Sequence, residues 1–164
     1  MKYVCILIIV CLLFSCKTKN KRVTPNIYWE STCINYTAPE FYIAGLNFKS
    51  EVWFTYRVKL LNVQHDTMEI DAHDIQYFEV IDSVKNVLYS SLPSKIITPN
   101  ESCIFNLKTK EKLQISFNEN ARKDSIYPKS NVLINRTKLF CVFNLDTIEI
   151  KKSKDFFIDS NVAN

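Results

Sequence analysis

The stretch of sequence that decides the fold is Val52-Trp53-Phe54-Thr55-Tyr56-Arg57-Val58-Lys59-Leu60. Its even-numbered residues are all apolar, whereas its odd-numbered residues are largely polar. Because successive side chains of a β-strand point to opposite faces, this alternation predicts a strand with one buried and one wet face. The same alternation recurs at 113–117 and, less regularly, at 103–107.

Outward from this stretch, the chain contains many short apolar runs separated by turn-forming residues. We expect further strands near 27–36, 41–48, 74–81, 86–90, 131–143, 146–151 and 155–158. No stretch beyond the first fifteen residues shows a helical stripe of apolar residues. Close spacing of short strands favours a single all-β domain over 27–159, an antiparallel β-sandwich, followed by a short tail at 160–164. A small lipocalin-type β-barrel is the alternative, because its strands would show the same alternation.

The composition excludes several classes of function. Hydrophobic residues make up 47% of the 164 residues, which is enough for a packed core. The single glycine excludes the glycine-rich loops that bind nucleotide phosphates, and two histidines leave little material for acid–base catalysis. A net charge of +4 does not indicate a nucleic-acid binder. We therefore expect neither an enzyme nor a cofactor.

The first fifteen residues predict a secretion signal. The apolar run from Val4 to Phe14 follows Lys2 and, as a helix, would span about 16 Å, roughly half of a bilayer core. This length is typical of a signal peptide and too short for a transmembrane helix.

The end of this run, Leu13-Phe14-Ser15-Cys16, resembles the lipobox of bacterial lipoproteins. The resemblance implies cleavage before Cys16 and attachment of lipid chains to that residue, which would anchor the chain durably in a membrane. A plain signal with Cys16 as an ordinary thiol is the alternative. Residues 16–26 form a basic tether with Lys17, Lys19, Lys21 and Arg22. In some Gram-negative lipoproteins an acidic stretch directly after the lipidated cysteine directs export to the cell surface. Because this tether is basic, we expect an outer-membrane location facing the periplasm. The alternative is that the charge of the tether does not affect sorting.

The segment 52–107 resembles the small immunoglobulin-like domains of bacterial envelope lipoproteins. An aromatic strand ends in Leu61-Asn62, a second strand runs over 77–82, and Ile97-Thr98-Pro99-Asn100 leads into a third. The resemblance implies a fold and no particular activity.

Three cysteines besides Cys16 follow the signal, namely Cys33, Cys103 and Cys141. At most one intramolecular disulfide can form among three thiols. Cys103 and Cys141 both lie on apolar faces of predicted strands and are the candidate pair, although two buried thiols that pack as small apolar side chains are the equal alternative.

The segment 64–74 contains both histidines of the chain, His65 and His73, and four acidic residues. In an extended strand Glu69, Asp71 and His73 would project from one face and could bind Zn²⁺ or Ca²⁺. The more ordinary interpretation is a polar connection between two strands.

Four sites share the pattern of aspartate, then serine or threonine, then an apolar residue. This pattern is similar to the acceptor motif of an O-glycosylation system in one group of Gram-negative bacteria, and it would place glycans on Thr67, Ser83, Ser125 and Thr147. Aspartate followed by serine or threonine also favours turns, which is the alternative explanation.

The sequence favours a non-catalytic module that binds another envelope protein, such as an immunity or inhibitor-type lipoprotein. A small-ligand or metal carrier, using the barrel interior or the 65–74 segment, is the alternative. Aromatic residues that alternation places outside or leaves ambiguous are the candidate contacts, with Tyr42 and Trp53 foremost among Tyr28, Trp29, Tyr36, Phe41, Tyr42, Trp53 and Phe140. Rings that instead pack beneath loops would have no such role. We expect binding to survive the loss of both histidines.

Overall fold

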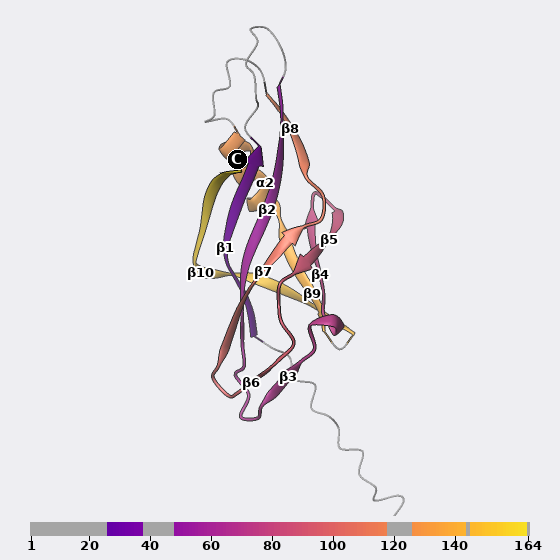
Figure 1. Cartoon of the computed structure of the whole chain (residues 1–164), viewed down its shortest axis with the longest axis vertical. Helices are drawn as coiled ribbons and strands as arrows, with labels where there is room; N and C mark the ends of the chain where they lie inside the picture. Colours follow the sequence, from indigo (N-terminus) through magenta and orange to yellow (C-terminus); the bar gives the residue numbers. More distant parts are fainter. Residues whose placement is uncertain (1–25, 38–47, 118–125, 144, 164) are drawn as a thin grey trace, which may run out of the picture.

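A computed structural model describes residues 26–37, 48–117, 126–143 and 145–163 (Figure 1). Its elements in chain order are β1 Asn26–Thr37, β2 Phe48–Leu61, β3 Met68–Ile70, the 3-10 turn η1 Ala72–Asp74, β4 Gln76–Ile81, β5 Val84–Ser90, β6 Lys95–Ile97, β7 Ser102–Thr109, β8 Leu113–Phe117, the helix α2 Ile126–Arg136, β9 Lys138–Phe143 and β10 Asp146–Ala163. The prediction of an all-β fold is confirmed.

Seven strands form one closed ring. Their order is β1, β10, β9, β4, β5, β7 and β2, and β2 pairs back onto β1. Neighbouring strands are antiparallel except for β1 and β10, which run parallel. Because hydrogen-bonded pairing continues around the whole ring, the fold matches the barrel alternative better than the two-layer sandwich of immunoglobulin type.

One wall of the barrel is interrupted where β7 passes into β8. Both strands pair with β2, at Thr55↔Lys108 for β7 and at Val52↔Leu113 for β8. The chain advances five positions from Lys108 to Leu113 while β2 advances only three, so residues 110–112 bulge out of the wall. The pairing between β5 and β7 ends at Leu88↔Thr109, next to this bulge.

Large apolar side chains fill the barrel interior. The even-numbered residues from Val52 to Leu60 are all buried, as the alternation predicts. Trp29 is only 1% exposed and packs edge-on against Tyr56, with ring centroids 5.3 Å apart. The expectation that Trp29 lies outside or in an ambiguous position is therefore wrong. A bulge between Trp29 and Ser31 changes which residues of β1 point inward, so strict alternation does not hold across it.

The prediction of a strand over 131–143 is wrong for its first part, because residues 126–136 form α2. Its buried positions Ser130 and Ile134 are spaced by four residues, which is the spacing of one helix face, and the buried Thr137 follows directly after the helix ends. Figure 1 shows α2 near the end of the barrel opposite to the small sheet formed by β3 and β6.

The folded region extends slightly beyond its expected boundaries. Strand β10 reaches Ala163 because residues 160–163 continue the parallel pairing with β1, so the expected tail at 160–164 is largely strand. The signal, Cys16 and all but the last residue of the tether lie outside the described residues, as does nearly all of the strand expected at 41–48. Within the described part of the chain, no helix is long and apolar enough to cross a membrane.

Candidate functional site

Apolar side chains cover the outer surface of three adjacent strands, β5, β4 and β9. Inward-pointing residues alternate with them along each strand, such as Tyr77 and Glu79 on β4 and Leu88 on β5, and these are buried. The outward-pointing set, which we call the outer aromatic face, consists of Phe78, Val80, Val87, Tyr89, Phe140 and Val142. Outward positions of an antiparallel sheet are ordinarily polar, so this surface requires an explanation.

The centre of the outer aromatic face is a stacked pair of phenylalanines. Phe78 stands opposite Phe140 on one side and opposite Val87 on the other. The two phenylalanine rings lie 5.1 Å apart at an interplanar angle of 14°, so they are stacked on each other across the two strands. Val87 and Tyr89 are each 59% exposed, which leaves much of the face in contact with water.

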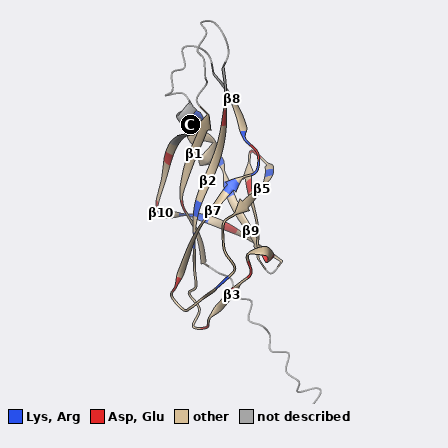
Figure 2. Ribbon diagram, viewed as in Figure 1, with Lys and Arg blue, Asp and Glu red and all other residues tan. Residues whose placement is uncertain are grey.

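Lysines lie next to this face in the register of the strands, and Figure 2 colours all lysines and arginines of the described residues blue. Val80 stands between Lys85 and Lys138 in the register of the three strands, and Tyr89 stands opposite Lys108. The Lys85 ammonium group lies 3.9 Å from the centroid of the Phe78 ring, within the range of a cation–π contact.

A buried carboxyl group lies behind the face, inside the barrel. Glu79 is 1% exposed, accepts a hydrogen bond from the Tyr56 hydroxyl, and accepts a second from the Asn86 side-chain amide at 3.2 Å. Burial raises the pKa of Glu79, and the two hydrogen bonds act in the opposite direction. Burial and the neighbouring Glu79 also hold the pKa of Tyr56 well above its usual value.

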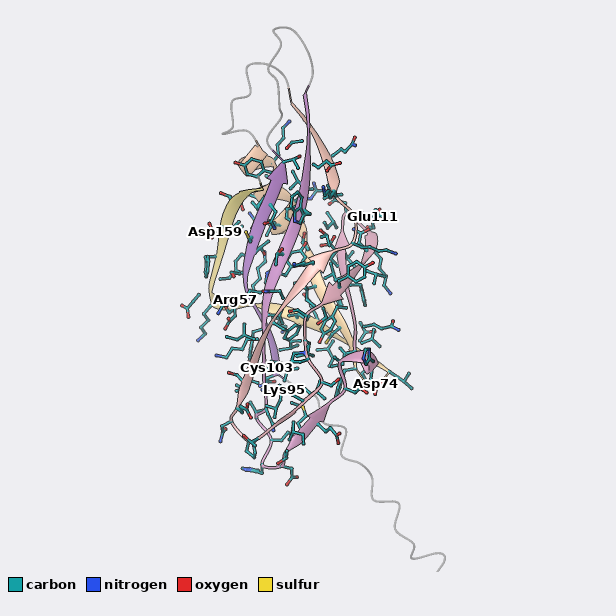
Figure 3. The ribbon with its side chains drawn as sticks, viewed as in Figure 1. Arg57, Asp74, Lys95, Cys103, Glu111 and Asp159 are labelled. Atoms are coloured by element: carbon teal, nitrogen blue, oxygen red, sulfur yellow. The ribbon has the colours of Figure 1, made fainter. Side chains whose placement is uncertain are left out.

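A cavity of about 260 Å³ opens at the interruption in the wall and reaches Glu79. It lies between Lys85–Val87 of β5 and the bulge at 110–112. Figure 3 shows Glu111, which is on this bulge, near the upper end of β5. The carboxyl group of Glu79 accepts hydrogen bonds from two strands other than its own, so its clearest role is to join β2, β4 and β5.

Trp53, one of the two foremost candidates for binding, lies on the outer side of β2. Its ring is partly buried, and the Lys112 ammonium group lies 4.9 Å from the ring centroid while also pairing with Glu51 at 2.7 Å. Tyr42, the other candidate, lies outside the described residues. Trp53 is therefore covered by a neighbouring ion pair, unlike Val87 and Tyr89.

The candidate metal ligands do not share one strand face. Strand β3 ends at Ile70, and the Asp71 carboxylate caps η1 by accepting hydrogen bonds from the His73 backbone amide and the Ser94 hydroxyl. The alternation that would align Glu69 with the other two is thus broken. Among the described residues, no group of three or more His, Cys, Asp and Glu side chains is placed to hold a metal ion.

The cysteines inside the barrel are separate thiols. Cys103 and Cys141 are both buried, and no disulfide joins them. Burial raises the pKa of Cys141 to about 11. In this structure both side chains are buried in the barrel interior, and the choice between the two alternatives stays a prediction. Cys33 is partly exposed on β1, with its sulfur 3.7 Å from the Asn35 side-chain oxygen.

The candidate glycosylation sites that the structure describes are on the surface. Thr67, Ser83 and Thr147 are exposed, whereas Ser125 lies outside the described residues. Exposure is compatible with a glycan and equally with an ordinary turn.

Sequence reasoning named Phe140 among the aromatic residues that could lie outside, but it missed Phe78, Val87 and Tyr89. In 76–81 both sets of alternate residues are mostly apolar, so alternation does not indicate which set faces water. Glu79 was the only charged residue in either set. It predicts that its own set, with Tyr77 and Ile81, faces water, whereas the structure buries that set.

Comparison with known proteins adds no relative. No protein-family model, no curated protein and no solved structure matches the chain. What can be said about function therefore comes from the residues and their arrangement.

Proposed function

We propose that the chain is a lipid-anchored, periplasm-facing, non-catalytic module that binds another envelope protein through the outer aromatic face. The observation that carries this proposal is the stacked pair Phe78 and Phe140, flanked by exposed Val87 and Tyr89 on the wet side of the barrel wall. Contiguous apolar surface of this kind is costly in water unless a partner covers it. An immunity or inhibitor-type lipoprotein is one class of protein with this design.

The carrier alternative has less support. Trp29, Phe54 and Tyr56 occupy the barrel interior, where a lipocalin-type ligand would otherwise bind. The 65–74 segment does not bring its candidate ligands together.

The anchor is tested at Cys16. If Cys16 carries the lipid, Cys16→Ala moves the protein from the membrane pellet to the soluble fraction, because no acyl chains remain to hold it. Incorporation of a labelled fatty acid into the wild type, and not into the variant, checks the same point. A variant that still pellets, together with an unlabelled wild type, contradicts the anchor.

The binding surface is tested by site-specific photo-cross-linking. A cross-linking phenylalanine analogue replaces Val87 in one variant and Ile96 in the other, since both are exposed aliphatic residues on strands, at 59% and 61%. Only Val87 lies on the outer aromatic face. We expect a discrete protein adduct in the envelope from position 87 alone, retained when His65 and His73 are both replaced by alanine. Adducts of equal yield from both positions, or none from position 87, contradict the proposal.

A further inference from the structure

We infer that the partner of the outer aromatic face is an acidic protein surface on which carboxylates flank an apolar patch. This inference rests on the proposed function and names the chemistry of the partner. It is carried by the lysines that surround the face and by the half-buried position of its two phenylalanine rings.

The border of the face is mainly basic. Lys85 and Lys138 stand on either side of Val80, Lys108 stands opposite Tyr89, and Lys110 lines the same cavity as Val87. Two acidic residues lie nearby: Glu149, opposite Phe140, and Glu111, on the bulge. The positive charges outnumber the negative ones, so an acidic surface is attracted and a basic one is repelled.

These lysines differ from five other basic residues of the barrel in having no acidic partner. Arg57 and Lys59 pair with Glu30, Lys95 pairs with Glu101, Lys112 with Glu51 and Arg136 with Asp82. Among the residues that the structure describes, no such ion pair neutralises the four lysines of the border, which are Lys85, Lys108, Lys110 and Lys138. Their charge therefore remains available to a partner.

The shape of the face favours a protein over a lipid surface. Phe78 and Phe140 are both half-buried among their neighbours, and the Lys85 ammonium group lies over the Phe78 ring. Side chains that bind a bilayer must reach past the headgroups to the acyl chains. Half-buried rings can instead be matched by the packed centre of a protein interface.

The inference is tested on the full chain carrying Cys16→Ala, with three probes of stated composition. One probe is a soluble peptide that alternates glutamate with leucine or phenylalanine, and the second carries lysine in place of each glutamate. The third is a phosphatidylglycerol vesicle. Binding is followed by calorimetry and by amide chemical shifts of Phe78, Val87 and Phe140, at low salt and at high salt.

We expect the glutamate peptide to bind and to shift these amides, and its affinity to fall at least about tenfold from about 50 mM to about 500 mM salt. Lys85→Glu together with Lys138→Glu should shift the preference toward the lysine peptide. Lys154→Glu is the matched control, because Lys154 is exposed on β10 away from the face, and it should leave the preference unchanged. Equal binding of both peptides, failure of both to bind, or tighter binding of the vesicle overturns the inference.

The cross-linking experiment separates this inference from the proposed function. If the adduct at position 87 forms with unchanged yield in the Lys85→Glu/Lys138→Glu variant, the binding face stands and its acidic partner does not. If no variant yields an adduct, the binding face itself is wrong.

Discussion

Glu79 is an ionisable residue in the barrel interior, where the neighbouring strands contribute mainly apolar side chains. Its position on the inward face of β4 costs desolvation of the carboxyl group, which hydrogen bonds from Tyr56 and Asn86 offset in part. Since these donors come from β2 and β5, one side chain connects three strands.

This residue makes stability depend on pH. Burial raises the pKa of Glu79 above its ordinary 4.5, so the folded protein binds this proton more tightly than the unfolded chain does. The contribution of Glu79 to the free energy of unfolding is therefore fully present at low pH and is lost as pH rises through the folded-state pKa. Glu79→Gln, which keeps an acceptor and cannot ionise, should remove that loss.

Urea unfolding from about pH 4 to about pH 8 measures the effect. The variant should gain stability relative to the wild type as pH rises. Tyr56→Phe provides the opposite case, because it deletes a hydrogen bond that lowers the pKa of Glu79. The pKa should rise further, so the free energy of unfolding should fall more steeply with pH than in the wild type. Parallel pH profiles for wild type and Glu79→Gln would contradict this account.

At the scale of single elements, a strand or helix could be predicted from the sequence only where the residues of its buried face differ in polarity from those of its exposed face. Strand β2 was predictable because its buried and outer residues differ in chemistry at nearly every position. Helix α2 was not, because its buried position Ser130 is polar, as is Thr137 directly after its end, and its apolar run Val132-Leu133-Ile134 is typical of a strand. The outer aromatic face could not be assigned from β4 and β9 alone, since both sides of these strands are mostly apolar.

The helix offers a matched pair of substitutions. Ile134 is fully buried and Val132 is 55% exposed. Ile134→Ala should lower the free energy of unfolding by about 2–5 kcal/mol through lost packing, while Val132→Ala should change it by less than about 0.5 kcal/mol. Chemical denaturation of both variants checks this, and similar losses at the two positions would mean that residues 131–136 are arranged differently.

The turn between β4 and β5 places two residues other than glycine in the left-handed region of backbone conformation. Asp82 and Ser83 both have positive φ, at 50° and 72°, a conformation that disfavours residues with a Cβ atom. Ser83→Gly should therefore raise the free energy of unfolding by about 1 kcal/mol. Thermal denaturation detects the gain as a higher Tm, and Ser91→Gly, at an exposed residue outside this turn, should not reproduce it.

At the scale of the whole molecule, the ring is closed by the parallel seam between β1 and β10. Its register shifts between Trp29 and Ser31, opposite residues 153–156 of β10. Phe156 fills this irregular place, with its ring 4.9 Å from that of Trp29, whereas the adjacent Phe157 is 58% exposed.

Phe156 should therefore matter to the closed barrel and Phe157 should not. We expect Phe156→Ser to cost about 2–4 kcal/mol of unfolding free energy and Phe157→Ser less than about 1 kcal/mol. Urea denaturation followed by tryptophan fluorescence reports both, since Trp29 lies at the seam. The reverse order of effects would show that the seam packs through the other phenylalanine.

The parallel seam also fixes the order in which the molecule can mature. Strand β1 is among the first described residues to be synthesised, but residues 151–163, which cover its second edge, come only after every other strand of the ring. Until then β1 offers an uncovered edge that a neighbouring nascent chain could occupy, the start of a domain swap or an aggregate. Keeping nascent chains apart until the late strand arrives should therefore reduce such pairing between chains.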